Sequence, residues 1–116
     1  MNIRETAEAF TNLLKAGDFA GAGQNFWHED VSSIEAMGEP AALHGRDAVA
    51  AKMQAWGEAH EVHGFTVTGP FLNDDQFALY MTIDATIRAT GHRMSMLEVA
   101  LYTVQDGQIV EERFFY

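Results

Sequence analysis

The sequence predicts a single α+β domain, with three helices in its first half and a curved, mainly antiparallel sheet in its second. Apolar residues follow helical spacing over roughly the first sixty positions. From Glu61 onward, segments rich in Val, Ile, Thr, Phe and Tyr alternate with short turns, which is typical of strands. The length of 116 residues is that of one ordinary domain, so we expect residues 1–116 to form a single unit.

Three segments carry the pattern of helices. In the first, apolar residues recur from Ile3 to Leu14 at positions that share one helical face, and Gly17 follows as a plausible stop. Asp18 can cap a second, shorter helix, because its carboxylate can accept hydrogen bonds from free backbone N–H groups. The third helix is expected over residues 46–59.

The strand pattern begins with a short segment at 31–35 and then dominates the second half. Four long strands are expected there: 62–72, 76–89, 93–105 and 108–116. The dipeptide Asp106-Gly107 favours a tight hairpin, since both residues tolerate the positive φ angles of a type I′ turn. Long strands joined by short turns predict an antiparallel meander.

Both faces of the strand at 93–105 are largely apolar, so both should be covered. The helices can cover one face only. We therefore predict a homodimer that packs sheet against sheet. Asp84 falls on the outer face by strand parity, where a Thr or Arg would pair with it.

Composition excludes several classes of function. The chain has 7 Lys and Arg against 17 Asp and Glu, a formal net charge of −10, and its basic residues are scattered, which argues against nucleic acid as a partner. The absence of cysteine removes disulfides and thiolate chemistry. No apolar run approaches the ~18 residues of a membrane span, and the N-terminus lacks a signal-peptide pattern. We expect a cytoplasmic protein that does not act at a membrane.

The order of four motifs resembles one known family. These motifs are AGDF at 16–19, FWHEDV at 26–31, HGRDAV at 44–49 and EVALYTVQDGQIV at 98–110. Together they resemble a SnoaL-like domain of the nuclear transport factor 2-like superfamily, whose relatives include ketosteroid isomerase and polyketide cyclases. The resemblance implies a cone-shaped α+β barrel with an apolar pocket between sheet and helices. It leaves function open, because this fold hosts many chemistries.

The same resemblance points to Glu35 and Glu98. Residues 31–38 are similar to the region of ketosteroid isomerase that holds its catalytic aspartate, and with one inserted residue Glu35 falls on that position. An apolar pocket would raise the pKa of Glu35 and suit it to act as a general base. The isomerase's tyrosine and aspartic acid donors fall on Phe10 and Ala100, so steroid isomerisation itself is not expected. A protonated Glu98, on the same strand face as Ala100, could donate a hydrogen bond instead.

His63 is the third candidate for catalysis. By strand parity it faces inward, where it could act as an acid, a base or a hydrogen-bond donor. Scytalone dehydratase, which resembles this fold, uses histidines with a carboxylate to eliminate water. His60 and His63 could suggest a metal pair, but the change from helix to strand between them breaks the ligand geometry and no third ligand is obvious. We expect neither a metal nor a cofactor.

Aromatic side chains are expected to line the pocket and bind the substrate, together with His60. They are Phe10, Trp27, Trp56, Tyr102 and Phe114. Such a wall suits a small apolar molecule. Strand parity also turns Glu112 inward. The sequence thus favours a cofactor-independent isomerase, cyclase or dehydratase that uses acid–base chemistry on an apolar carbonyl compound. The alternative is a domain without catalysis that binds a ligand or serves as a dimeric scaffold.

Overall fold

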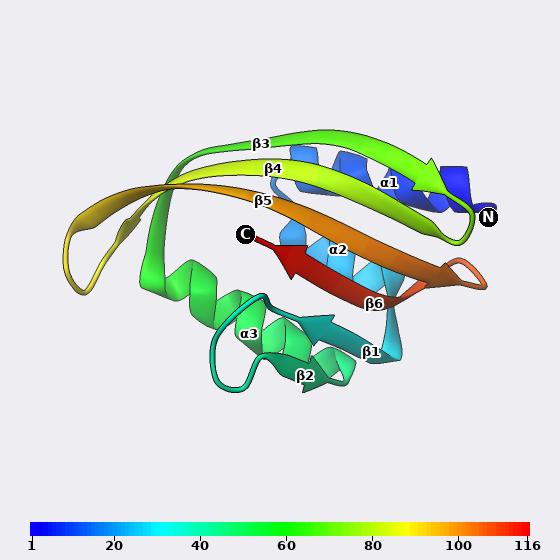
Figure 1. The fold of residues 1–116 in the computed structure, drawn as a ribbon, viewed down its shortest axis with the longest axis horizontal. Coiled ribbons are helices and arrows are strands. Elements are labelled where there is room, and N and C mark those ends of the chain that lie inside the picture. Colours follow the sequence, from blue (N-terminus) through cyan, green and yellow to red (C-terminus); the bar gives the residue numbers. More distant parts are fainter.

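The protein is described here by a computed structural model that covers residues 1–116. Three helices pack against one curled six-stranded sheet, which confirms the predicted α+β cone (Figure 1). The elements are α1 (Ile3–Lys15), α2 (Phe19–Phe26), β1 (Trp27–Ile34), β2 (Ala42–His44), α3 (Arg46–Ala59), β3 (His60–Asn73), β4 (Gln76–Ile87), β5 (His92–Gln105) and β6 (Gln108–Phe115).

The sheet has the order β2-β1-β6-β5-β4-β3. Strands β3 to β6 form the predicted antiparallel meander, and β1 joins it by pairing parallel to β6. Two features were not predicted. Strand β1 begins at Trp27 rather than at Val31, and the three-residue strand β2 pairs with its far edge.

The predicted caps and turns are present. Asp18 accepts a hydrogen bond from the backbone N–H of Gly21 at the start of α2. Asp106 and Gly107 both have positive φ angles, 51° and 77°, as the tight turn between β5 and β6 requires. The helix expected over residues 46–59 is α3.

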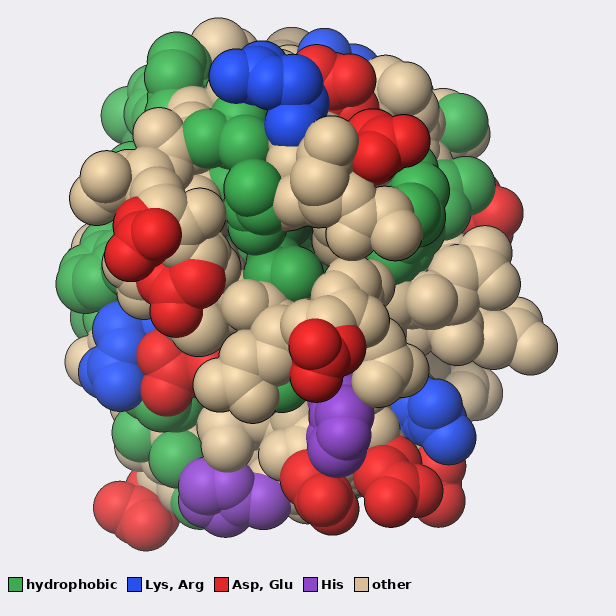
Figure 2. Space-filling view, turned by 90° about the vertical axis from the view of Figure 1, so that its right-hand side faces the viewer, with side chains coloured by type: hydrophobic (Ala, Val, Ile, Leu, Met, Phe, Trp, Pro, Cys, Tyr) green, Lys and Arg blue, Asp and Glu red, His purple; other side chains and the backbone are tan.

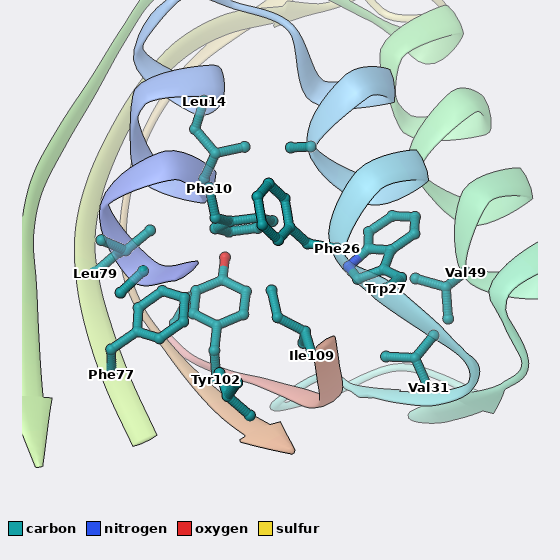
Figure 3. Close-up of a cluster of buried hydrophobic side chains, with 14 of the residues drawn as sticks. Phe10, Leu14, Phe26, Trp27, Val31, Val49, Phe77, Leu79, Tyr102 and Ile109 are labelled. Atoms are coloured by element: carbon teal, nitrogen blue, oxygen red, sulfur yellow. The ribbon is translucent and has the colours of Figure 1, made fainter. Parts of the chain in front are cut away.

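A closed hydrophobic core occupies one end of the cone, between α1, α2 and the inner face of the sheet. Phe10 lies at its centre and makes edge-to-face contacts with the rings of Phe26, Phe77 and Tyr102 (Figure 3). The same close-up shows Trp27, Val31 and Val49 at the side where β1 meets α3. This cluster holds the helices against the sheet.

The inner face is less covered at its other end. Along β5 the inward residues pass from half-buried Met94 and Met96, through half-buried Glu98, to buried Ala100 and Tyr102. Figure 1 shows β3, β4 and β5 extending past α1 and α2 toward the turn between β4 and β5. Glu98 therefore lies where the closed core gives way to the more open end of the cone.

None of the three helices combines the length and the hydropathy needed to cross a bilayer. Figure 2 views the molecule from the end that faces right in Figure 1. On this face Lys and Arg side chains lie apart from one another, among acidic side chains. The face carries no basic patch of the kind that binds nucleic acid.

The backbone geometry of the turn between β5 and β6 can be tested by changing glycine to alanine, once in the turn and once in a helix as a control. Gly107→Ala should lower the free energy of unfolding by about 1–2 kcal/mol, because an alanine is strained at a φ of 77°. Gly57→Ala, in α3 with open space around the new methyl group, should raise it by up to ~1 kcal/mol. Urea denaturation of both variants measures the difference; effects of the same sign would contradict the assigned turn geometry.

Candidate functional site

The candidate site is a group of polar side chains on the inner face of three neighbouring strands. Pairing in the sheet sets their positions: Ser33 on β1 lies beside Glu112 on β6, which lies beside Tyr102 on β5. One step along each strand on the same face, Phe114 of β6 lies beside Ala100 of β5. Glu98 lies one step beyond Ala100, where the inward residues of β5 change from buried to half-buried.

Glu112 is the buried anchor of this group, with only 3% of its surface exposed. The indole of Trp27 donates to its Oε1 at 3.1 Å, and the Ser33 hydroxyl donates to its Oε2 at 2.7 Å. Burial raises the pKa of Glu112, while the bonds from Ser33 and Trp27 and the charge of Lys52 oppose that rise. A buried carboxyl is costly without such partners, so these bonds secure β1 to β6 at the site.

Lys52, on α3, connects Ser33 to Glu35. Its Nζ donates to the Ser33 hydroxyl oxygen and, at 2.9 Å, to Oε1 of Glu35. The other oxygen of Glu35 accepts a hydrogen bond of 3.0 Å from the hydroxyl of Tyr116. Both oxygens of Glu35 are thus occupied. Lys52 also lies over the ring of Phe114, with Nζ 5.4 Å from the ring centroid.

Glu98 differs from Glu112 because no hydrogen bond contributes to its pKa shift. Its pKa is raised from 4.5 to about 7. Burial is the largest cause, the negative charges of Glu35 and Glu112 add to it, and the charge of Lys52 opposes it. A carboxyl with a pKa near neutrality can both release and take up a proton under ordinary conditions.

The structure separates the predicted aromatic wall into three parts. Phe10 and Tyr102 belong to the closed core, with 2% and 3% of their surfaces exposed, and Trp27 serves as the donor to Glu112. Trp56 and His60 are half-buried and stack face to face, with ring centroids 4.1 Å apart. Phe114, the remaining member of the predicted wall, is half-buried and lies beneath Nζ of Lys52.

The prediction that His63 faces inward is wrong. Its side chain is exposed, and its Nε2 is hydrogen-bonded at 2.7 Å to the hydroxyl of Thr86. The pairing of β3 with β4 shifts register between Val62 and Gly64, so one extra residue enters β3 there. A bulge of this kind breaks strand alternation, and that is why counting by twos from Phe65 misplaces His63.

Asp84 lies on the outer face, as parity predicted, and it forms a two-pronged ion pair with Arg93 at 3.0 and 2.8 Å. That pair and the Arg93 charge lower the pKa of Asp84. Asp84 therefore belongs to a surface contact between β4 and β5 and not to the inner cluster.

Sequence reasoning missed Lys52 and Ser33. Lys52 lies three residues after buried Val49 and four before half-buried Trp56, so helical spacing places it on the inward side of α3 but does not identify its partners. Its role follows from the distance in space between α3 and β1, which periodicity does not encode. The three glutamates do not converge as metal ligands, since no group of three His, Asp or Glu side chains has geometry that could hold an ion.

The fold and this carboxylate cluster define a class: small α+β cones with ionisable groups on the inner sheet face. The sequence model of the SnoaL-like domain family matches residues 1–116. The chain therefore belongs to the SnoaL-like domain family. None of the curated protein sequences compared with the chain matches it.

Solved structures agree with this assignment. A Mesorhizobium loti protein, described both as a proposed SnoaL-like polyketide cyclase and as a carbohydrate phosphatase, is 53% identical, with a TM-score of 0.97 over 100% of both chains. A proposed isomerase from Bacillus subtilis shares the fold at 19% identity and a TM-score of 0.78, over 98% of this chain and 88% of that one. A Catenulispora acidiphila protein with a ketosteroid isomerase-like fold is 18% identical, with a TM-score of 0.69, over 82% and 72%.

The raised pKa of Glu98 predicts how stability depends on pH. Between pH 4.5 and about 7 the folded protein keeps a proton on Glu98 that the unfolded chain has lost. This group therefore makes the folded state less stable as pH rises through that range, by at most about 1.4 kcal/mol per pH unit. Glu98→Gln removes the effect, so its Tm should exceed that of the wild type at pH 8 by more than at pH 5.

Thermal unfolding of both proteins at the two pH values gives this comparison. Glu61→Gln, at an exposed carboxyl of β3, is the matched control and should follow the wild type at both. If Glu98→Gln and the wild type differed equally at pH 5 and pH 8, the carboxyl would have an ordinary pKa.

Proposed function

We propose that this protein is a cofactor-independent enzyme that moves protons on an apolar carbonyl compound, as an isomerase, cyclase or dehydratase does. The observation that carries this proposal is Glu98: a half-buried carboxyl at the open end of the core, with a pKa of about 7. A general base works best when its pKa lies near the working pH. The names polyketide cyclase and isomerase, given to two relatives, agree with this class of chemistry, whereas carbohydrate phosphatase, the second name of the Mesorhizobium loti relative, does not.

In this proposal the proton moves to and from Glu98, and Glu35 has a supporting part. Both oxygens of Glu35 are engaged, by Lys52 and Tyr116, so its carboxylate is less available to a substrate. Its negative charge instead helps to raise the pKa of Glu98. Half-buried Met94 and Met96, on the same strand face, would contact the apolar body of the substrate, as would the Trp56 and His60 stack.

The alternative is a domain without catalysis. Phe10 supports it, because the position that carries a hydroxyl donor in ketosteroid isomerase holds a phenylalanine packed into the core. We give it second place, because a scaffold has no need of a half-buried carboxyl whose ionised form destabilises the fold. The absence of cysteine fits a reducing compartment, so we place this activity in the cytoplasm.

Exchange of carbon-bound hydrogen tests the proposed activity. The protein should accelerate deuterium uptake from D2O at the carbon next to the carbonyl of 2-tetralone, an apolar aromatic ketone, as followed by proton NMR. The rate should rise with pH through about 7 as Glu98 loses its proton. Glu98→Gln should lower it by at least about 100-fold, since glutamine cannot accept the proton.

Glu61→Gln is again the matched control and should retain the wild-type rate. Absence of protein-dependent exchange, or an equal rate in Glu98→Gln, would contradict the proposed activity and favour the scaffold alternative.

We also propose that a second copy of the chain covers the outer face of the sheet. Large apolar side chains are exposed there: Phe71, Tyr80, Leu97, Val99 and Phe115. Leu97 is 61% exposed, and Tyr80 and Phe115 both pair with Val99, so the patch is continuous across three strands. A patch of this kind is typical of an interaction surface, and the same surface on two copies can pair about a two-fold axis.

Leu97→Lys should therefore convert a dimer into a monomer, because pairing would bury two added charges. Sedimentation equilibrium measures the mass, and Thr90→Lys, in the exposed turn between β4 and β5, is the control that should remain dimeric. A wild-type protein that sediments as a monomer of 12.9 kDa would overturn this part of the proposal.

A further inference from the structure

Lys52 has a free donor over Phe114, whose strand partner Ala100 lies one step along β5 from Glu98. An ammonium group carries three N–H bonds. Two of them are taken by Ser33 and Glu35, and the Lys52 side chain keeps 26% of its surface exposed. Its charge reaches Glu98, whose pKa it lowers against the effects of burial and of the neighbouring carboxylates. One N–H of Lys52 can therefore still bind an acceptor.

The direction of the hydrogen bonds holds this ammonium in place. Ser33 donates its own proton to Glu112, so its oxygen has lone pairs to accept from Lys52. Trp27 secures Glu112 from the other side. A donor held in this way needs little rearrangement when charge develops next to it, which is the condition for electrostatic catalysis.

We propose that Lys52 is a catalytic residue that binds the carbonyl oxygen of the substrate and stabilises the oxyanion formed when the proton moves to Glu98. This inference rests on the proposed function and names the group that polarises the substrate. In the step, the C–H bond next to the carbonyl breaks and its proton binds a carboxylate oxygen of Glu98. The electron pair forms a C=C bond, and the carbonyl oxygen becomes an enolate oxygen beside Nζ of Lys52. Return of the proton to carbon, at the same or another position, restores Glu98.

The charges of the cluster favour this step. Before it, the negative charge is on Glu98, and after it Glu98 is neutral and the substrate oxygen carries the charge. The total is unchanged, and the charge has moved next to an ammonium group. The neutral hydroxyl donor that the position of Phe10 lacks is thus replaced by a cation from α3. The ligand class that follows is an aromatic or apolar ketone, or the enolate or phenolate that imitates its intermediate.

Binding of 2-naphthol tests this role without requiring turnover. The naphtholate anion imitates the enolate, and its absorbance reports the pKa of the bound molecule. In Glu98→Gln, which lacks the competing carboxylate, naphtholate should bind more than about tenfold tighter than neutral naphthol, as a hydrogen bond to a charged donor provides. Adding Lys52→Met should abolish that preference and leave the binding of neutral naphthol within about twofold. Lys52→Arg should retain most of the preference.

A second measurement needs no variant at Lys52. In Glu98→Gln with 13C-labelled lysine, the Cε resonance of Lys52 should shift when naphthol is added above the pKa of naphthol and should not shift when it is added below that pKa. The resonance of Lys15, exposed on α1, should not respond in either case. Equal affinity for both forms of naphthol, absence of naphthol binding, or an unmoved Lys52 resonance would each overturn the role of Lys52. A naphtholate preference in a protein without deuterium exchange would uphold the Lys52 site and refute the proposed activity, so the two failures are distinguishable.

Discussion

The polar cluster on the inner face of the sheet depends on one interaction: hydrogen bonds from Trp27 and Ser33 hold the buried Glu112 carboxyl in place. These two bonds join β1 to β6 on the inner face, and the Ser33 hydroxyl then accepts Lys52 from α3. Without them a carboxyl with 3% exposure would be unpartnered, at a cost of several kcal/mol if ionised. The position of Lys52, the orientation of Glu35 and the electrostatic environment of Glu98 all follow from this arrangement.

The fold was predictable from sequence because its signals are local. The spacing from Ile3 to Leu14 and the Asp106-Gly107 turn each act within a few residues and agree with the final structure. Strand β2 was not predicted, because it is only three residues long and depends on its pairing with β1. Resemblance and parity together singled out Glu35 and Glu98; the structure joins Glu35 to Lys52, and the charge of Lys52 acts on Glu98.

The rest of the site could not be predicted, for two physical reasons. A bulge between Val62 and Gly64 inverts the direction expected of His63, and nothing in the local sequence marks a bulge there. Helical spacing from Val49 and Trp56 places Lys52 on the inward side of α3, but its partners lie 17 and 19 positions away in the chain. A long, flexible side chain on a helix acquires a role only when tertiary packing brings acceptors within its reach.

The proposed activity requires that the inner face hold one carboxyl, Glu98, ready to exchange a proton near neutral pH. A 13C NMR titration of the side-chain carboxyl carbons, with Glu98 assigned from the Glu98→Gln variant, measures this property directly. Glu98 should titrate with a midpoint near 7. A midpoint near the ordinary value of about 4.5 would contradict it, because such a carboxylate is already ionised, well solvated and a weak base at neutral pH.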